Sequence, residues 1–88
     1  MNEKITAILE KAKEVVSKGE LSKADQASMK QYGEEVVAWI NTIAYCRQEK
    51  ISEEEVRSTE VAKENIEAVD RAYQIVAKRD KILKGIFS

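Results

Sequence analysis

Hydrophobic residues recur along this chain at spacings of three and four, which is the period of an α-helix. In the first segment, residues 3–17, they form one apolar stripe: Ile5, Ile8, Leu9, Ala12, Val15 and Val16. Lys18 and Gly19 follow, and glycine favours the left-handed backbone that ends many helices. The pattern predicts a short N-terminal helix within residues 1–19.

A second helical segment begins at Ser22 and continues to a polar turn at residues 48–51. Ser22 and Asp25 fit a capping box in which aspartate takes the usual glutamate position. The apolar face of this segment contains Met29, Val36, Ile40 and Ile43. Gly33 falls inside the predicted helix, where it costs about 1 kcal/mol relative to alanine. Close approach of a backbone or ligand would explain Gly33, and so would a tolerated local cost.

A third segment, residues 52–87, contains no proline and continues the helical pattern. Ser52 and Glu55 predict a capping box at its start. Its apolar residues alternate at spacings of four and three, as in a heptad seam with Asp80 as the one polar member: Ala62, Ile66, Val69, Tyr73, Val76, Asp80, Leu83 and Phe87. A single helix of this length would span roughly 50 Å. A globule of 88 residues has a radius of gyration of about 12 Å and is about 30 Å across.

We therefore expect the third helix to extend beyond its own protomer and to pack against another copy. The predicted fold is all-α, with a single helical domain over residues 1–88. An N-terminal helix (1–19) precedes a helical hairpin (21–88) whose second helix is long. A chain of this size has a thin core, which also favours a homo-oligomer.

Composition limits the classes of function. The formal net charge is −1, so the chain lacks the positive charge that binding to duplex nucleic acid requires. No hydrophobic run is long enough for a membrane span, and we expect no signal peptide. The single cysteine, Cys46, cannot form an internal disulfide and suits a reducing cytoplasm.

Catalytic patterns are largely absent from the sequence. The chain has no histidine and no Cys-x-x-Cys pair, which removes His-based triads and the common zinc sites. The neighbouring acids at 34–35 and 53–55 fit a solvated helix surface. We expect no enzyme, no metal site and no cofactor.

A small anionic ligand fits the sequence better than a substrate does. Cations for phosphates and flat side chains for bases are spread over the two longer segments: Lys30, Tyr32, Trp39, Tyr45, Arg47, Arg57, Lys63, Arg71 and Tyr73. Contact between protomers could gather them into a pocket. The alternative interpretation places Trp39 and Tyr73 in the core and the cations on the surface.

Two stretches of the sequence resemble a known family. Leu21-Ser22 opens a helix that continues into Lys30-Gln31-Tyr32-Gly33-Glu34-Glu35. Further on come Arg57, Val61-Ala62-Lys63, Ile66 and Ala72. These positions resemble the phage cyclic-oligonucleotide sponges, which are anti-CBASS proteins whose helical hairpin domain is shared with a group of anti-Thoeris sponges. The resemblance covers residues 21–78.

The chain also departs from that family at three places. Ser58 follows Arg57 where the family has an aromatic residue, and Val69-Asp70-Arg71 replaces a Gly-Phe-Met run. Lys18-Gly19-Glu20 stands where the family carries a base-stacking tyrosine. The stacking residue could instead be any of Tyr32, Trp39 or Tyr45.

The resemblance implies a homohexamer that traps cyclic dinucleotides, and often cyclic trinucleotides, in the host cytoplasm without cleaving them. It implies that Lys30 contacts phosphate, with Arg57 and Lys63 as further ligand-binding residues, and Tyr32 is the candidate stacking residue. A helical adaptor that binds a host protein through the heptad face is the alternative, and a small nucleotide-processing enzyme is a third interpretation.

Overall fold

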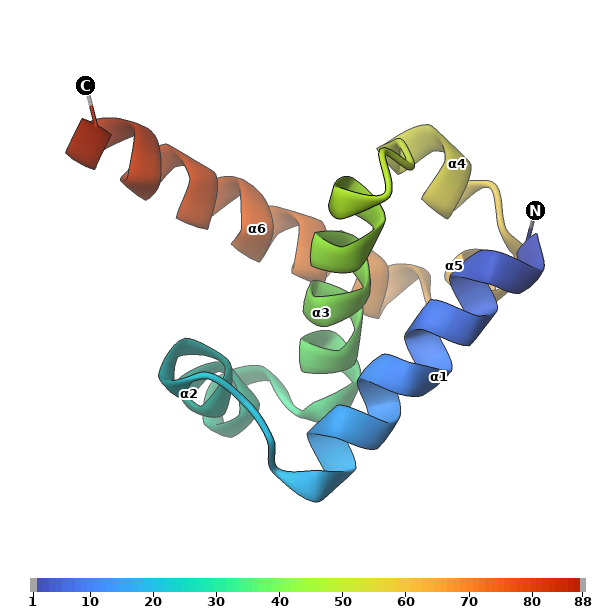
Figure 1. Ribbon diagram of the computed structural model, residues 1–88, viewed down its shortest axis with the longest axis horizontal. Helices are drawn as coiled ribbons and strands as arrows, with labels where there is room; N and C mark the ends of the chain where they lie inside the picture. The colour runs from blue at the N-terminus through green and yellow to red at the C-terminus, as the bar shows by residue number, and fades with distance from the viewer. Residues whose placement is uncertain (1, 88) are drawn as a thin grey trace.

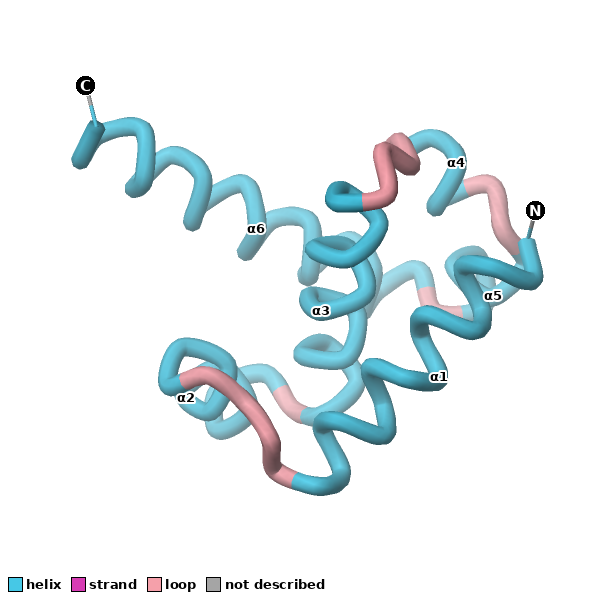
Figure 2. Tube along the Cα trace, viewed as in Figure 1, coloured by secondary structure: helices cyan, strands magenta, loops and turns pink. Residues whose placement is uncertain are grey.

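The computed structural model describes residues 2–87, with side chains described from 3 to 85. Within this range all the regular structure is helical (Figures 1 and 2), which confirms the all-α prediction. The helices are α1 (Asn2–Lys18), α2 (Lys23–Tyr32), α3 (Glu34–Gln48), α4 (Glu53–Arg57), α5 (Glu60–Glu64) and α6 (Ile66–Phe87).

Helix α3 is the centre of the fold. Helix α1 packs along one side of α3, and α6 crosses another side (Figure 1). Because α3 is covered from both sides, its hydrophobic residues are buried around much of its circumference. The N-terminal helix therefore packs within its own protomer, a point that the sequence left open.

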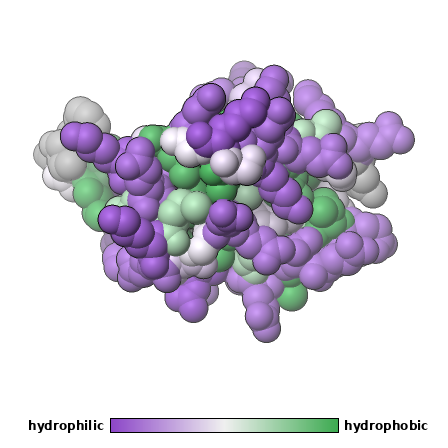
Figure 3. Space-filling view, turned by 90° about the horizontal axis from the view of Figure 1, so that it is seen from below, coloured by the Kyte–Doolittle hydropathy of each residue, from purple (hydrophilic) through white to green (hydrophobic). Residues whose placement is uncertain are grey.

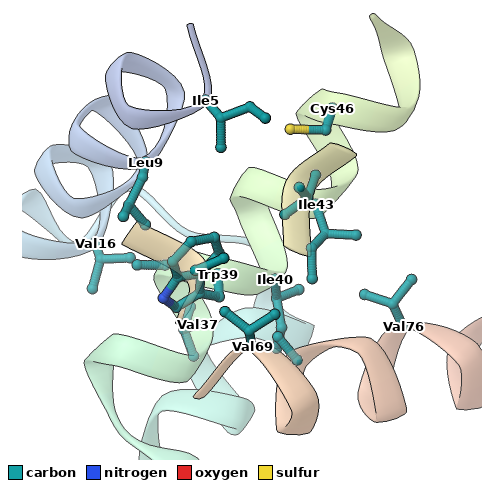
Figure 4. Close-up of a cluster of buried hydrophobic side chains, with 14 residues drawn as sticks. Ile5, Leu9, Val16, Val37, Trp39, Ile40, Ile43, Cys46, Val69 and Val76 are labelled. Atoms are coloured by element: carbon teal, nitrogen blue, oxygen red, sulfur yellow. The ribbon is translucent and has the colours of Figure 1, made fainter. Parts of the chain in front are cut away.

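The core lies where α1, α3 and α6 meet (Figure 4). Trp39 of α3 is fully buried there, next to Leu9 of α1 and Val69 of α6. The other buried hydrophobic residues are Ile5, Ala12, Val16, Val37, Ala38, Ile40, Ile43, Cys46, Val56, Ala62, Ala72 and Val76. Trp39 is thus a core residue, as one of the two sequence interpretations proposed.

The predicted second helix is interrupted at Gly33, so the expectation of one continuous helix there is wrong. Gly33 has φ 95° and ψ 171°, and it both ends α2 and precedes α3. This backbone conformation is accessible almost only to glycine. At the start of α2, the Ser22 side chain accepts a hydrogen bond from Asp25 N, which is one half of the predicted capping box. The reciprocal bond is not formed within the described residues, because the Asp25 carboxylate accepts from Arg79 instead.

The expectation of one helix from Ser52 to Phe87 is also wrong. Thr59 interrupts it: the hydroxyl accepts from Ala62 N and donates to Val56 O at 2.7 Å, which caps a new helix. Asn65 ends that helix with φ −121°, and its amide donates to Val61 O. Such local side-chain bonds compete with a continuous helix. The capping box of Ser52 and Glu55 is present as predicted.

The remaining long helix, α6, has 22 residues and spans about 33 Å at 1.5 Å per residue. The molecule measures 36 × 29 × 22 Å with a radius of gyration of 12.6 Å. Arg79 and Asp80 of α6 still bond to α2 and α3, and the end of α6 beyond them extends away from the other helices (Figure 1). Part of the predicted overhang is therefore present.

The heptad seam does not form one free face. Val69 and Val76 are buried within their own protomer, whereas Ile66 is 43% exposed. Asp80 forms an ion pair with Arg47 at 2.8 Å. Beyond Asp80 the stripe reaches solvent at Leu83, which is 52% exposed. The part of the seam available to a partner is therefore short. The last seam position, Phe87, lies outside the residues whose side chains are described.

Candidate functional site

Helix α2 is attached to α6 by polar and aromatic contacts. Arg79 of α6 donates to Asp25 Oδ1 and to Ser28 Oγ, both at 3.1 Å. Asp25 and Ser28 are both buried. These bonds therefore hold the first two turns of α2 against α6. At the other end, the guanidinium of Arg71 lies 5.7 Å from the centre of the Tyr32 ring.

An open groove of about 590 Å³ lies beside this second contact. We call it the Tyr32 groove; it is lined by Gln31, Tyr32, Glu35, Val36, Glu67, Ala68 and Arg71. Gly33 places α2 and α3 at an angle to each other, which brings residues 31–32 and 35–36 to the same groove. Its residues therefore come from three helices.

The Tyr32 groove combines a flat ring with a cation. An aromatic ring and an arginine guanidinium are both surfaces on which a nucleobase stacks. The arginine guanidinium also binds phosphate in a bidentate manner, through two parallel N–H···O hydrogen bonds. Glu35 and Glu67 would repel a phosphate, but their carboxylates can accept hydrogen bonds from base N–H groups. A phosphate in this groove would therefore lie toward Arg71.

The four residues singled out in the sequence occupy different places. Lys30 is exposed in the last turn of α2, and Tyr32 is half-buried two residues later. Arg57 lies at the end of α4, and Lys63 is exposed in α5. None of the hydrogen bonds, ion pairs or ring contacts within the described range joins two of these four. Lys30 and Tyr32 share one helix end, but residues two positions apart on a helix point to different faces, and only Tyr32 lines the groove.

Arg57 is already engaged within the protomer. Its guanidinium donates to Glu53 Oε2 at 2.7 Å and to Asp70 Oδ1, and it lies 4.8 Å from the centre of the Tyr73 ring. The hydrogen bonds to Asp70 and Glu53 raise the pKa of Arg57. A phosphate at Arg57 would have to compete with two carboxylates.

Arg71 lines the Tyr32 groove but is not one of the four residues that the sequence singled out. The sequence shows it as one cation among many, and its contact with Tyr32 joins positions 39 residues apart in the chain. No local spacing signals such a contact, because it depends on how α2 folds back on α6. Trp39, named as a possible stacking residue, is fully buried and has no surface for a base.

No protein-family model, curated protein or solved structure matches the chain. None of the helices in the described range is both long enough and apolar enough to span a bilayer. Among the same residues, no cluster of three or more His, Cys, Asp or Glu side chains is arranged to hold a metal ion.

Proposed function

We propose that this protein binds cyclic di- and trinucleotide immune signals at the Tyr32 groove and sequesters them intact. The observation that carries the proposal is the Tyr32–Arg71 pair at an open groove, with Lys30 exposed at the end of the same helix. The sequence resemblance over Lys30–Glu35 supports the same ligand class. Host cytoplasm and the blocking of CBASS effectors belong to this proposal.

The groove suggests how such a ligand is held. One base stacks on the Tyr32–Arg71 pair, which supplies most of the dispersion contact. The phosphate nearest this base interacts with Arg71, away from the carboxylates of Glu35 and Glu67. Lys30 does not line the groove, so in this proposal it contacts a phosphate of the ligand that extends beyond the groove. Stacking on a ring accepts any base, which suits a protein that binds several cyclic nucleotides.

Sequestration requires affinity and abundance rather than turnover. The fraction of signal that is trapped depends on the dissociation constant and on the concentration of the protein relative to the signal. Tight complexes usually differ from weak ones in how slowly they dissociate. Burial of the ligand between protomers would slow its release.

A homohexamer is part of the same proposal. The support within the protomer is the end of α6, where Ile82 and Leu83 are 59% and 52% exposed. Green surface appears at this end of the molecule in Figure 3, beside the grey terminus. Exposed hydrophobic side chains on a projecting helix are typical of a protein–protein contact.

The same observation favours the second candidate, an adaptor that binds a host protein. In that case the end of α6 packs on the partner instead of on another copy, and the Tyr32 groove binds no nucleotide. The two candidates differ in their response to a cyclic dinucleotide.

The test is a calorimetric titration of 3′,3′-cGAMP into the wild-type protein and the Lys30→Ala variant. We expect the variant to bind at least about tenfold more weakly, a loss of about 1.4 kcal/mol, because a phosphate loses its cation. Lys23→Ala is the matched control, since Lys23 is exposed at the opposite end of α2. Equal affinity for all three proteins would remove Lys30 from the site, and no binding at all would favour the adaptor.

A further inference from the structure

A second groove, of about 360 Å³, lies between α1 and α3. We call it the Tyr45 groove. Its apolar floor consists of Ala7, Ile8, Ala12 and Val15, and all four belong to α1. It shares no lining residue with the Tyr32 groove.

The sequence of α1 explains why this groove is open. The apolar stripe of α1 is wider than the strip that α3 covers. Leu9 and Val16 are buried against α3, whereas Ile8 and Val15 of the same stripe are only half-buried. Ala7 and Ala12 are too small to fill the space beside them.

The charged residues that line the Tyr45 groove are both cations. Lys4 and Lys11 belong to α1, seven residues apart and on the same side as Ile8. Lys4 also lies 3.6 Å from a carboxylate oxygen of Glu49, while Lys11 has no ion-pair partner among the described residues. The lining of this groove includes no carboxylate, in contrast to Glu35 and Glu67 of the Tyr32 groove.

Helix α3 contributes an aromatic ring and an amide. Tyr45 is 50% exposed, so part of its ring is available for stacking. One turn earlier, Asn41 Nδ2 donates to Val37 O at 3.0 Å. That bond orients the amide and leaves its oxygen as the acceptor for a ligand N–H or O–H group.

We propose that the Tyr45 groove is a binding site for a planar aromatic anion. The ring of such a ligand lies on Tyr45 and on the alanine and isoleucine floor. Its carboxylate or phosphate group pairs with Lys11, and with Lys4 in competition with the Glu49 carboxylate. Nucleotides and aryl phosphates both have this chemistry. The groove volume falls within the range of about 300–1,000 Å³ for small-molecule sites.

The probe for this site is 1-naphthyl phosphate, titrated into ¹⁵N-labelled protein and followed by amide chemical shifts. We expect shifts at Ala7, Ile8, Ala12, Asn41 and Tyr45. Lys11→Gln should weaken binding at least about fivefold, because it removes a cation and keeps an unbranched polar side chain. Lys13→Gln is the matched control: Lys13 lies on the same helix and lines a different groove, together with Glu10 and Glu14.

Tyr45→Leu tests the ring. Leucine keeps an apolar contact in the groove and removes the stacking surface, and an unchanged thermal midpoint would show that the fold is intact. We expect this variant to bind the probe at least about threefold more weakly.

Three outcomes would overturn the proposal. The first is a set of shifts confined to the Tyr32 groove. The second is the absence of saturable shifts. The third is equal binding of 1-naphthol, which has the same ring without the phosphate, together with no effect of Lys11→Gln.

Discussion

The phenol of Tyr73 lies half-buried against the core, 4.8 Å from the guanidinium carbon of Arg57. Burial is the largest cause that raises the pKa of Tyr73, to about 12 from 10.0, and Glu53 adds to it. Arg57 acts in the opposite direction, because a nearby cation favours the phenolate. The neutral phenol is therefore the form that the folded protein stabilises.

This pKa shift predicts a loss of stability at high pH. Below pH 10 the Tyr73 phenol is neutral in both the folded and the unfolded state. The stability that comes from its raised pKa is therefore fully present. Between about pH 10 and pH 12 the unfolded chain ionises first, and the free energy of unfolding falls. Tyr73→Phe cannot ionise and should lose less stability over the same range. Urea unfolding of both proteins at about pH 9 and about pH 11 measures the difference. An equal loss in the two proteins would contradict the shift, because the lysines titrate in both.

Individual site residues could be predicted only in part. Lys30 and Tyr32 lie two residues apart on one helix, a spacing that puts their side chains on different faces, and only Tyr32 lines the groove. Arg57 has one partner at helical spacing, Glu53, which the sequence could indicate, and a second, Asp70, which is 13 residues away across two helix breaks. The contact with Asp70 cannot be predicted until those breaks are known.

At the scale of helices, the pattern of hydrophobic residues predicts where helices form but not where they are interrupted. The period of three and four continues through Gly33, Thr59 and Asn65. Each of these residues breaks a helix by its own backbone or side-chain preference. The Gly33 break matters most for the proposed site, since it turns the end of α2 toward the Tyr32 groove.

Substitutions at two glycines test this account of the break. Gly33→Ala should cost about 1–3 kcal/mol, because alanine is strained at φ 95° although no atom lies within 4 Å of the added Cβ. Gly85→Ala, in the last turn of α6, should instead stabilise by up to about 0.5 kcal/mol, less than in the middle of a helix. Chemical denaturation measures both. A neutral or stabilising effect at Gly33 would mean that α2 and α3 tolerate a continuous helix.

For the whole molecule, α6 divides into a packed part that reaches Asp80 and a projecting end beyond it, and this division determines which residues can mediate assembly. Val76 is 7% exposed and belongs to the core of its own protomer. A charge at that position would unfold the protomer and reveal nothing about self-association. Leu83 lies two turns later, in the projecting end of α6. The heptad pattern does not distinguish Val76 from Leu83, because it does not show where the core of the protomer ends.

Leu83→Glu therefore tests self-association. We expect the variant to dissociate into folded monomers, with an association constant at least about tenfold lower, because a charge replaces an apolar contact between copies. Gln74→Glu is the control, with the same added charge at an exposed position of α6. Sedimentation velocity gives the mass, and far-ultraviolet circular dichroism confirms the helices. A wild-type protein that is already monomeric would contradict the proposed oligomer.

The most direct test of the central claim is a native mass spectrum recorded with and without 3′,3′-cGAMP after long incubation. A protein that sequesters the signal should appear as an oligomer that gains whole ligand masses, and the ligand released by denaturation should be unchanged. An oligomer that gains no ligand mass, or a ligand recovered as a linear dinucleotide, would contradict sequestration.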